Sequence, residues 1–202
     1  MKINEMLEAL GLAWSLENYE ALATDAAQKH WSHVEYLAHL MEGEAARRHD
    51  NRVLRRIKAA HFPVIKTLDQ FNWSWPKKIN REHIQNLFRL AFMKEHSNII
   101  LIGGVGLGKT HLATALGYEA CQKGHSVLFT TAVEIINTLG AAQVNHRLKA
   151  ELKRYTRPEL LIIDEIGYLP IDKQGADMLF QVISHRYERG SMIITTNKAF
   201  KH

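Results

Sequence analysis

Hydrophobic residues in the N-terminal half of the chain recur every three or four positions, the spacing of an amphipathic helix. Start and stop signals bound these stretches: Gly11 and Pro63 are helix terminators, and Ser32 with Glu35 forms a capping box. Asn80 is a further expected N-cap. Together these signals predict helices over residues 3–10, 16–29, 32–60 and 80–95.

The pattern changes after residue 97, where short apolar runs alternate with longer amphipathic stretches. Such alternation indicates a parallel sheet covered by helices on both faces, because strands buried on two sides are apolar throughout. The predicted fold class is therefore α/β, preceded by an all-helical N-terminal region. The runs NIILI, SVLFT, LLIID and MIITT predict strands over 98–102, 126–130, 160–164 and 192–196, and helices are predicted over 109–123, from 131 onward, over 146–155 and over 172–189.

The segment TLDQFNWSWPKK separates the two patterns. It has no clear periodicity and contains a proline, so we interpret it as a linker. The predicted organisation is a helical region over 1–66, a linker over 67–79 and an α/β core over 80–202. Trp73 and Trp75 are expected to hold the linker against the core; the alternative is that they stack on nucleic-acid bases.

Composition excludes several classes of protein. Hydrophobic residues make up 46% of the chain and charged residues 23%, which is typical of a globular protein and not of a disordered one. No apolar run is long enough to span a membrane, and the N-terminus lacks the basic-then-apolar order of a secretory signal. Cys121 is the single cysteine and cannot form an internal disulfide. We therefore expect a cytoplasmic protein with no membrane partner.

Positive charge is concentrated in one quarter of the chain. Residues 1–46 carry 2 basic and 8 acidic residues, whereas 47–94 carry 12 basic and 3 acidic. A block of this kind favours a polyanionic partner. Basic residues lie at helical spacing within it, and few acidic residues follow them, so we interpret them as contacts to DNA phosphates, the alternative being a solvated charged face. The candidates are Arg48, Arg52, Arg55, Arg56 and Lys58.

The segment GGVGLGKT matches the phosphate-binding P-loop, and it has the required context of a preceding strand and a following helix. Glycines allow the backbone N–H groups to approach phosphate oxygens, and the helix adds its positive N-terminal end. Lys109 is expected to contact the β- and γ-phosphates, and the Thr110 hydroxyl to bind Mg²⁺. The predicted nucleotide-binding residues are Gly103, Gly104, Val105, Gly106, Leu107, Gly108, Lys109, Thr110 and His111.

Two more strand ends carry candidate catalytic groups. LLIIDE, about 55 residues after the P-loop, matches the Walker B pattern. Asp164 is expected to bind the Mg²⁺ shell, and Glu165 to orient and deprotonate the attacking water. Asn197, at the end of MIITTN, is expected to contact the γ-phosphate or the water; a plain turn residue is the alternative. These residues predict an ATPase that uses ATP and Mg²⁺.

The combination GGVGLGKTHLATALGYEA, LLIIDEIGYLP and RYERGSMIITTN resembles the IstB-like ATPases, the helper proteins of bacterial insertion-sequence transposition. The upstream segment EGEAARRHDNRVLRRIKAAHFPVIKTLDQFNW is also similar to that family. The resemblance implies a P-loop AAA+ ATPase, similar to DnaC-type helicase loaders. It further implies that the protein binds double-stranded DNA, forms a homo-oligomer on it with ATP, and stimulates a transposase.

Family members of this kind continue beyond the position that matches Asn197, with a last sheet strand, an arginine finger and a small helical lid. The resemblance therefore implies that the 202 residues lack these parts, bind ATP weakly, hydrolyse it negligibly and leave 98–102 as an open sheet edge. Two alternatives to a transposition helper stay open. One is a helicase loader of DNA replication, and the other is a DNA-binding adaptor with a vestigial nucleotide site.

Overall fold

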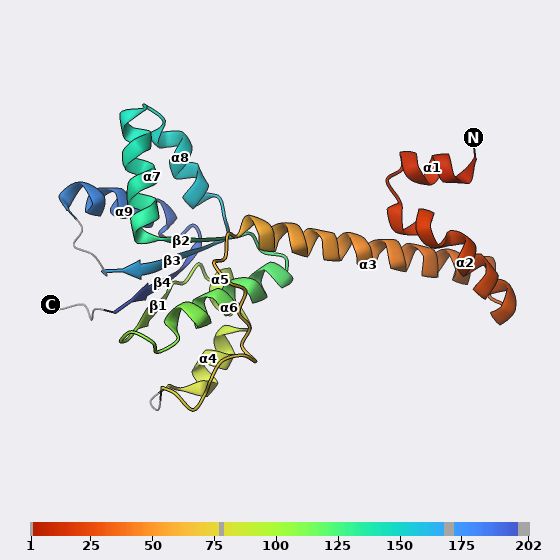
Figure 1. Ribbon diagram of the computed structural model, residues 1–202, viewed down its shortest axis with the longest axis horizontal. Helices are drawn as coiled ribbons and strands as arrows, with labels where there is room; N and C mark the ends of the chain where they lie inside the picture. The colour runs from red at the N-terminus through yellow and green to blue at the C-terminus, as the bar shows by residue number, and fades with distance from the viewer. Residues whose placement is uncertain (1, 77–78, 168–171, 198–202) are drawn as a thin grey trace. The chain divides into compact units, whose positions relative to one another are not determined.

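The computed structural model describes residues 2–76, 79–167 and 172–197. The chain divides into two compact units, Met1–Leu54 and Arg55–His202. We call them unit 1 and unit 2 and describe each by itself. The division falls within one long helix, α3 (His33–Ala59), which is the orange helix in Figure 1.

Unit 1 is helical, as the hydrophobic spacing predicts. It contains α1 (Ile3–Ala9), α2 (Ala13–Lys29) and the first part of α3. The predicted capping box is confirmed: the Ser32 backbone N–H donates to the Glu35 carboxylate at 2.7 Å, and the Glu35 N–H donates to the Ser32 hydroxyl at 3.2 Å. These bonds satisfy two of the N–H groups that a helix start leaves without partners.

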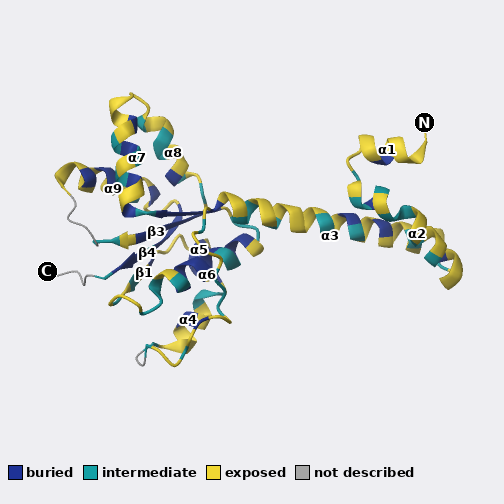
Figure 2. Cartoon of the chain, in the orientation of Figure 1, coloured by how far each residue is buried: buried dark blue, intermediate teal, exposed yellow. Residues whose placement is uncertain are grey.

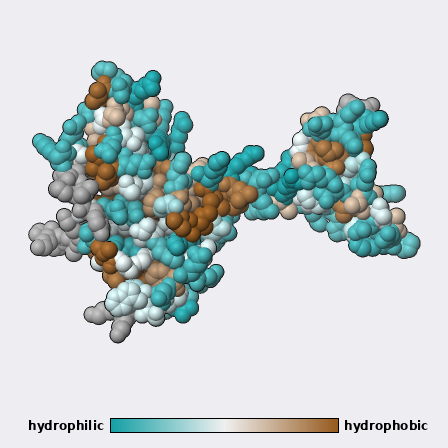
Figure 3. All heavy atoms as spheres, viewed as in Figure 1, coloured by the Kyte–Doolittle hydropathy of each residue, from teal (hydrophilic) through white to brown (hydrophobic). Residues whose placement is uncertain are grey.

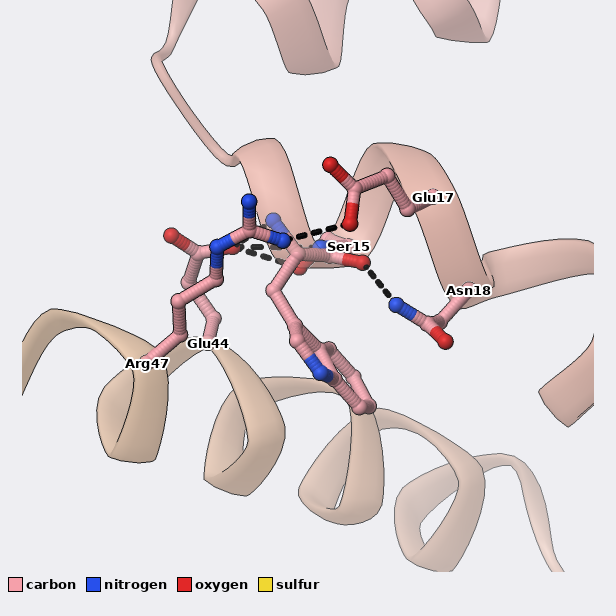
Figure 4. A network of polar contacts seen from close by, with 6 residues as sticks. Ser15, Glu17, Asn18, Glu44 and Arg47 are labelled. Carbon is pink, nitrogen blue, oxygen red and sulfur yellow. Dashed lines mark hydrogen bonds and ion pairs between the residues drawn. The ribbon is translucent and has the colours of Figure 1, made fainter. Parts of the chain in front are cut away.

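A buried carboxylate joins α2 to α3 (Figure 4). Glu44 is 5% exposed, and its Oε2 accepts hydrogen bonds from the backbone N–H groups of Trp14 and Ser15 at 3.0 and 3.1 Å. The preceding residue, Gly43, has no space for a side chain, because a Cβ there would lie 2.2 Å from the Trp14 ring. A second link is the ion pair between Arg47 and Glu17. Glu44 therefore caps the N-terminus of α2 from a residue about thirty positions away in sequence.

Unit 2 contains a four-stranded parallel sheet in the order β1-β4-β3-β2. Its strands are β1 (Ile99–Ile102), β2 (Val127–Thr131), β3 (Leu160–Ile166) and β4 (Ser191–Thr196). Since all four run parallel, their carboxyl ends meet at one edge of the sheet. Within the described sheet β1 and β2 are the two edge strands, and Ile100 and Ile102 of β1 are about half exposed.

Helices cover both faces of the sheet (Figure 1). One face packs against α6 (Lys109–Gln122) and the other against α7 (Ala132–Val144), α8 (Leu148–Thr156) and α9 (Lys173–Arg186). Successive residues of β3 alternate between the two cores: Leu160 and Ile162 face α6, and Leu161 and Ile163 face the other layer. Figure 2 shows β2, β3 and β4 as buried over most of their length, in contrast to β1.

Two predicted helices differ from the observed ones: one is interrupted and the other is shorter. The helix predicted over 80–95 is two short ones, α4 (Arg81–Leu87) and α5 (Ala91–Lys94), because Leu90 between them has φ +60° and cannot continue a helix. Asn80 does cap α4, accepting from the His83 N–H at 2.9 Å. α9 ends at Arg186 and not at residue 189, since Tyr187 leaves the helical conformation with ψ 126° and Glu188 has φ +60°.

The segment between α3 and α4 contains no helix or strand among its described residues. Phe71 anchors it: this ring is 6% exposed and packs in a small core with Ile84 and Leu112. Trp73 packs against that core, its ring 5.0 Å from that of Phe71, so the prediction is confirmed for this tryptophan. It is wrong for Trp75, which is 56% exposed and lies outside the core.

Candidate nucleotide-binding site

The glycine-rich segment 103–108 joins β1 to α6 at the carboxyl edge of the sheet. Gly106 and Gly108 have φ values of +76° and +81°, in the left-handed region that favours glycine. A Cβ on Gly108 would also lie 2.6 Å from the Phe71 ring. Because α6 begins directly after this loop, its free N–H groups and positive end face the loop.

Lys109 is held at the same loop. Its ammonium Nζ donates a hydrogen bond to the carbonyl oxygen of Gly104 at 2.7 Å. The charge therefore lies within the turn of backbone that the glycines form. This arrangement suits an anion that the loop N–H groups also bind.

Thr110 and Asp164 bring the two main motifs into direct contact. The Thr110 hydroxyl lies 3.1 Å from both carboxylate oxygens of Asp164, although the residues are 54 positions apart. Asp164 ends the buried part of β3 and is only 4% exposed. A hydroxyl and a carboxylate are hard oxygen donors of the kind that Mg²⁺ prefers, so this pair fits a magnesium ion by its chemistry.

Glu165 follows Asp164 at a break in the sheet. β3 and β4 are in regular register up to Ile163 opposite Ile194, and the register has shifted where Ile166 pairs with Thr196. Glu165 has φ +63° and its side chain is exposed, in contrast to the buried Asp164. The bulge therefore places two successive carboxylates in different environments, one fixed in the sheet and one open to solvent.

Asn197 lies just past the end of β4. Its side-chain oxygen Oδ1 is buried and has no hydrogen-bond partner among the described residues. A buried polar atom without a partner costs free energy, and such atoms are found where a ligand or water completes the bonding. This observation fits the predicted contact with phosphate or water.

His111 follows the predicted P-loop residues into the first turn of α6. Its Nε2 lies 2.9 Å from the carbonyl oxygen of Thr67, and its ring packs edge-on against Phe71. The side chain thus contacts the connecting segment. Whatever His111 contributes to a nucleotide would come from its backbone.

An apolar pocket of about 360 Å³ opens beside Lys109. It lies between β1, the P-loop with the start of α6, the end of the connecting segment and α4. A pocket of this size and composition suits a flat heteroaromatic group such as a nucleobase. Its lining residues are Pro76, Ile79, Ile84, Ile100, Leu101, Ile102, Leu107, Lys109 and Leu112.

The basic residues predicted to bind DNA all lie on α3, but they differ in their contacts. Arg48 is engaged within unit 1: its Nε donates to Glu44 at 3.0 Å and its guanidinium also donates to the Gly11 carbonyl at 3.1 Å. Arg52, Arg55 and Lys58 are exposed and form no ion pair with any described residue. Arg56 is half-buried. Sequence spacing treats these five side chains alike, whereas the structure separates Arg48 from the rest.

Sequence reasoning missed one polar residue of the site. Thr195 is buried in β4, and its hydroxyl contacts both Asp164 and the backbone of Glu165. The only signal in the sequence is the pair of threonines before Asn197, which is also ordinary strand composition.

Comparisons with known proteins agree with this geometry. A family model described as IstB-like ATP binding protein matches residues 5–202. The insertion sequence IS21 putative ATP-binding protein of Pseudomonas aeruginosa is 37% identical over 199 residues, covering 98% of this chain and 75% of the relative. The IS5376 putative ATP-binding protein of Geobacillus stearothermophilus is 36% identical over 199 residues, covering 98% and 79%.

Solved structures show the same fold. The DnaC helicase loader aligns with a TM-score of 0.57 at 24% identity, over 67% of this chain and 78% of that one. AMPPCP-bound DnaA from Aquifex aeolicus aligns with a TM-score of 0.59 at 21% identity, over 68% of this chain. The chain covers 43% of the DnaA chain, so the likeness concerns only part of that protein.

Among the described residues, no helix is both long and apolar enough to cross a membrane. The parallel sheet between helices, the P-loop at its carboxyl edge and the match over almost the whole sequence point to one conclusion. The chain belongs to the IstB-like ATP-binding proteins of insertion sequences, and its P-loop core has the same fold as the DnaC helicase loader.

Proposed function

We propose that this protein is a Mg²⁺-dependent ATPase that binds double-stranded DNA and assists a transposase. The observation that carries the catalytic part is the contact between Thr110 and Asp164, which unites the P-loop with the acidic end of β3. A P-loop without such an acidic partner would be consistent with nucleotide binding alone. The position of the P-loop, Asp164 and Glu165 at one edge of one sheet supports hydrolysis.

In this proposal each residue has a separate role. The loop N–H groups of 103–108 and the Lys109 ammonium bind the phosphates, and Thr110 with Asp164 would hold Mg²⁺. The bound Mg²⁺ would neutralise charge on the phosphate oxygens. Glu165, exposed beside the buried Asp164, orients a water molecule and accepts its proton. Asn197 directs its free oxygen or its amide to that water or to the terminal phosphate.

The DNA part of the proposal rests on α3. Its exposed Arg52, Arg55 and Lys58 are free to contact phosphates, and Arg56 lies beside them in the sequence. Arg48 contributes to unit 1 through its bond to Glu44. A transposase partner is part of the same proposal, and the insertion-sequence names of the relatives support it. We also propose a homo-oligomer on DNA, which follows from the family resemblance alone.

The helicase-loader alternative has the support of the fold alone, through the DnaC structure at 24% identity. The relatives named for insertion sequences reach 37% identity over nearly the whole chain, which favours transposition. A steady-state ATPase assay with Mg²⁺, with and without duplex DNA, tests the enzymatic part. Co-purification with the transposase of the same element, compared with a replicative helicase, separates the two partners. An adaptor with a vestigial site would bind DNA and release no phosphate.

A further inference from the structure

Thr195 is buried in β4 with 1% of its surface exposed. Its hydroxyl Oγ1 donates a hydrogen bond to the Asp164 carboxylate and accepts one from the backbone N–H of Glu165 at 3.0 Å. One side chain on a neighbouring strand therefore contacts both members of the acidic pair.

The bulge in β3 explains why this contact exists. Ile163 pairs with Ile194 and Ile166 pairs with Thr196, so two residues of β3 lie opposite Thr195 alone. The two residues are Asp164 and Glu165, and Glu165 takes a left-handed backbone conformation that is unfavourable for a residue with a side chain. A conformation of this kind persists only where surrounding contacts fix it, and the Thr195 hydroxyl binds its N–H.

The chemistry requires a hydroxyl. Oγ1 must give its proton to the carboxylate and at the same time accept one from the backbone, and a hydroxyl has one donor and two acceptor sites. Asp164 thereby receives hydroxyl bonds from two elements, Thr110 on α6 and Thr195 on β4. The bond from Thr195 fixes the carboxylate from the side of the sheet. An ion would therefore bind on the opposite side, where Thr110 lies.

We propose that Thr195 is a positioning residue of the Mg-nucleotide site: it orients the Asp164 carboxylate toward Thr110 and holds the bulge from which the Glu165 side chain projects. This inference rests on the proposed function. The side chain itself contacts neither nucleotide nor metal in the proposal. Groups that orient a metal ligand in this way change metal affinity or activity by about 10–100-fold when they are removed.

The test measures binding, so it does not depend on turnover. The full 202-residue chain is titrated with a fluorescent ATP analogue in EDTA and at increasing Mg²⁺ concentrations. For Thr195→Val, which has nearly the same shape but no hydroxyl, we expect the Mg²⁺ concentration for half-maximal enhancement of binding to rise by about 10–100-fold. The affinity in EDTA should stay close to that of the parent, because the P-loop is unchanged. Thr195→Ser keeps the hydroxyl and should restore the parent value.

Ser191→Ala is the matched control, since it removes a buried hydroxyl from the amino end of the same strand, where Ser191 donates to the Phe92 carbonyl at 3.2 Å. Its Mg²⁺ dependence should equal that of the parent. If Thr195→Val does not fold, Thr195→Cys has the same expected result, because a thiol is a weak donor and a weak acceptor.

A folded Thr195→Val or Thr195→Cys variant with the Mg²⁺ dependence of the parent would overturn the role of Thr195 alone. A parent chain that binds the analogue equally well in EDTA and in Mg²⁺ would instead refute the magnesium site of the proposed function, and with it this inference. The two failures are therefore distinguishable.

Discussion

The Arg186 guanidinium donates a hydrogen bond to the carbonyl oxygen of Ser191 at 2.8 Å, which joins the end of α9 to the start of β4. Three more of its bonds reach the carbonyl oxygens of Tyr155, Pro158 and Glu159 at 2.8–3.1 Å. Arg186 is 1% exposed and has no ion-pair partner among the described residues. The buried charge is therefore balanced by carbonyl dipoles at the end of α8, in the loop before β3 and at the start of β4.

From this arrangement we expect Arg186→Met to lower the free energy of unfolding by about 3 kcal/mol or more, because four carbonyls lose a charged donor. Chemical unfolding followed by circular dichroism measures the change. Arg189→Met is the control, since Arg189 is an exposed arginine three residues further along. Equal stability of the two variants would show that the buried bonds contribute nothing.

Two substitutions in the nucleotide site should affect different steps, one the binding of ATP and the other its hydrolysis. Lys109→Ala should lose most of the affinity for Mg-ATP, because Lys109 supplies the fixed positive charge at the loop. Glu165→Gln should keep the binding and lose hydrolysis, since an amide cannot accept the proton of the water. Isothermal titration measures the first effect. Phosphate release measures the second, with parent and variant both extended to the length of the relatives.

These two variants also test the assignment of roles. Glu165→Gln with the same phosphate release as the parent would show that Glu165 is not the base. Glu134→Gln is a matched control: Glu134 is an exposed carboxylate at the start of α7 that bonds Thr130 and lies outside the proposed site. It should leave both binding and hydrolysis unchanged.

The parts of the fold that could be predicted depend on local signals. The strands, the P-loop and the order of motifs follow from short apolar runs and from glycines that a tight turn requires. The hydrogen bond from the Glu165 N–H to the Thr195 hydroxyl depends on a register shift between strands whose residues lie 30 positions apart, and no local pattern encodes it. Glu44 likewise caps a helix from a distance in sequence, and its identity as a buried cap depends on the packing of Trp14.

The Glu44 cap predicts a pH dependence of unit 1. Burial raises the pKa of the Glu44 carboxyl, but hydrogen bonds from Ser15, Arg48 and Trp14 outweigh it and hold that pKa below the ordinary value of 4.5. A carboxylate with a folded pKa below its unfolded pKa stabilises the fold above the unfolded value. That contribution disappears as the pH falls through the folded value.

We therefore expect the stability that Glu44 provides to be constant near neutral pH and to be lost below 4.5. Glu44→Gln should be less stable than the parent at neutral pH by about 1–2 kcal/mol, and the difference should narrow in acid. Unfolding followed by tryptophan fluorescence at stepwise lower pH measures this. Glu42→Gln, an exposed carboxylate on the same helix, controls for the general effect of charge removal. If the parent and Glu44→Gln differed in free energy of unfolding by the same amount at every pH, the charge of Glu44 would not be what stabilises unit 1.

Contacts between α3 and DNA phosphates predict a specific salt dependence. Replacing Arg52, Arg55 and Lys58 with alanine should weaken binding to duplex DNA with little change in sequence preference, because phosphates carry no sequence information. Each lost contact should reduce the slope of log affinity against log salt concentration by about 0.9. Fluorescence anisotropy at several salt concentrations measures the slope for the parent, the three single variants and the triple variant.

Arg48→Ala separates this role from a structural one. Because Arg48 bonds Glu44 and the Gly11 carbonyl, its removal should lower the thermal stability of unit 1 and leave the salt slope unchanged. The exposed residues should give the reverse result, a smaller slope with little change in stability. If instead the triple variant keeps the slope of the parent, the basic side chains of α3 form a solvated charged face, and the DNA contacts of this protein lie elsewhere.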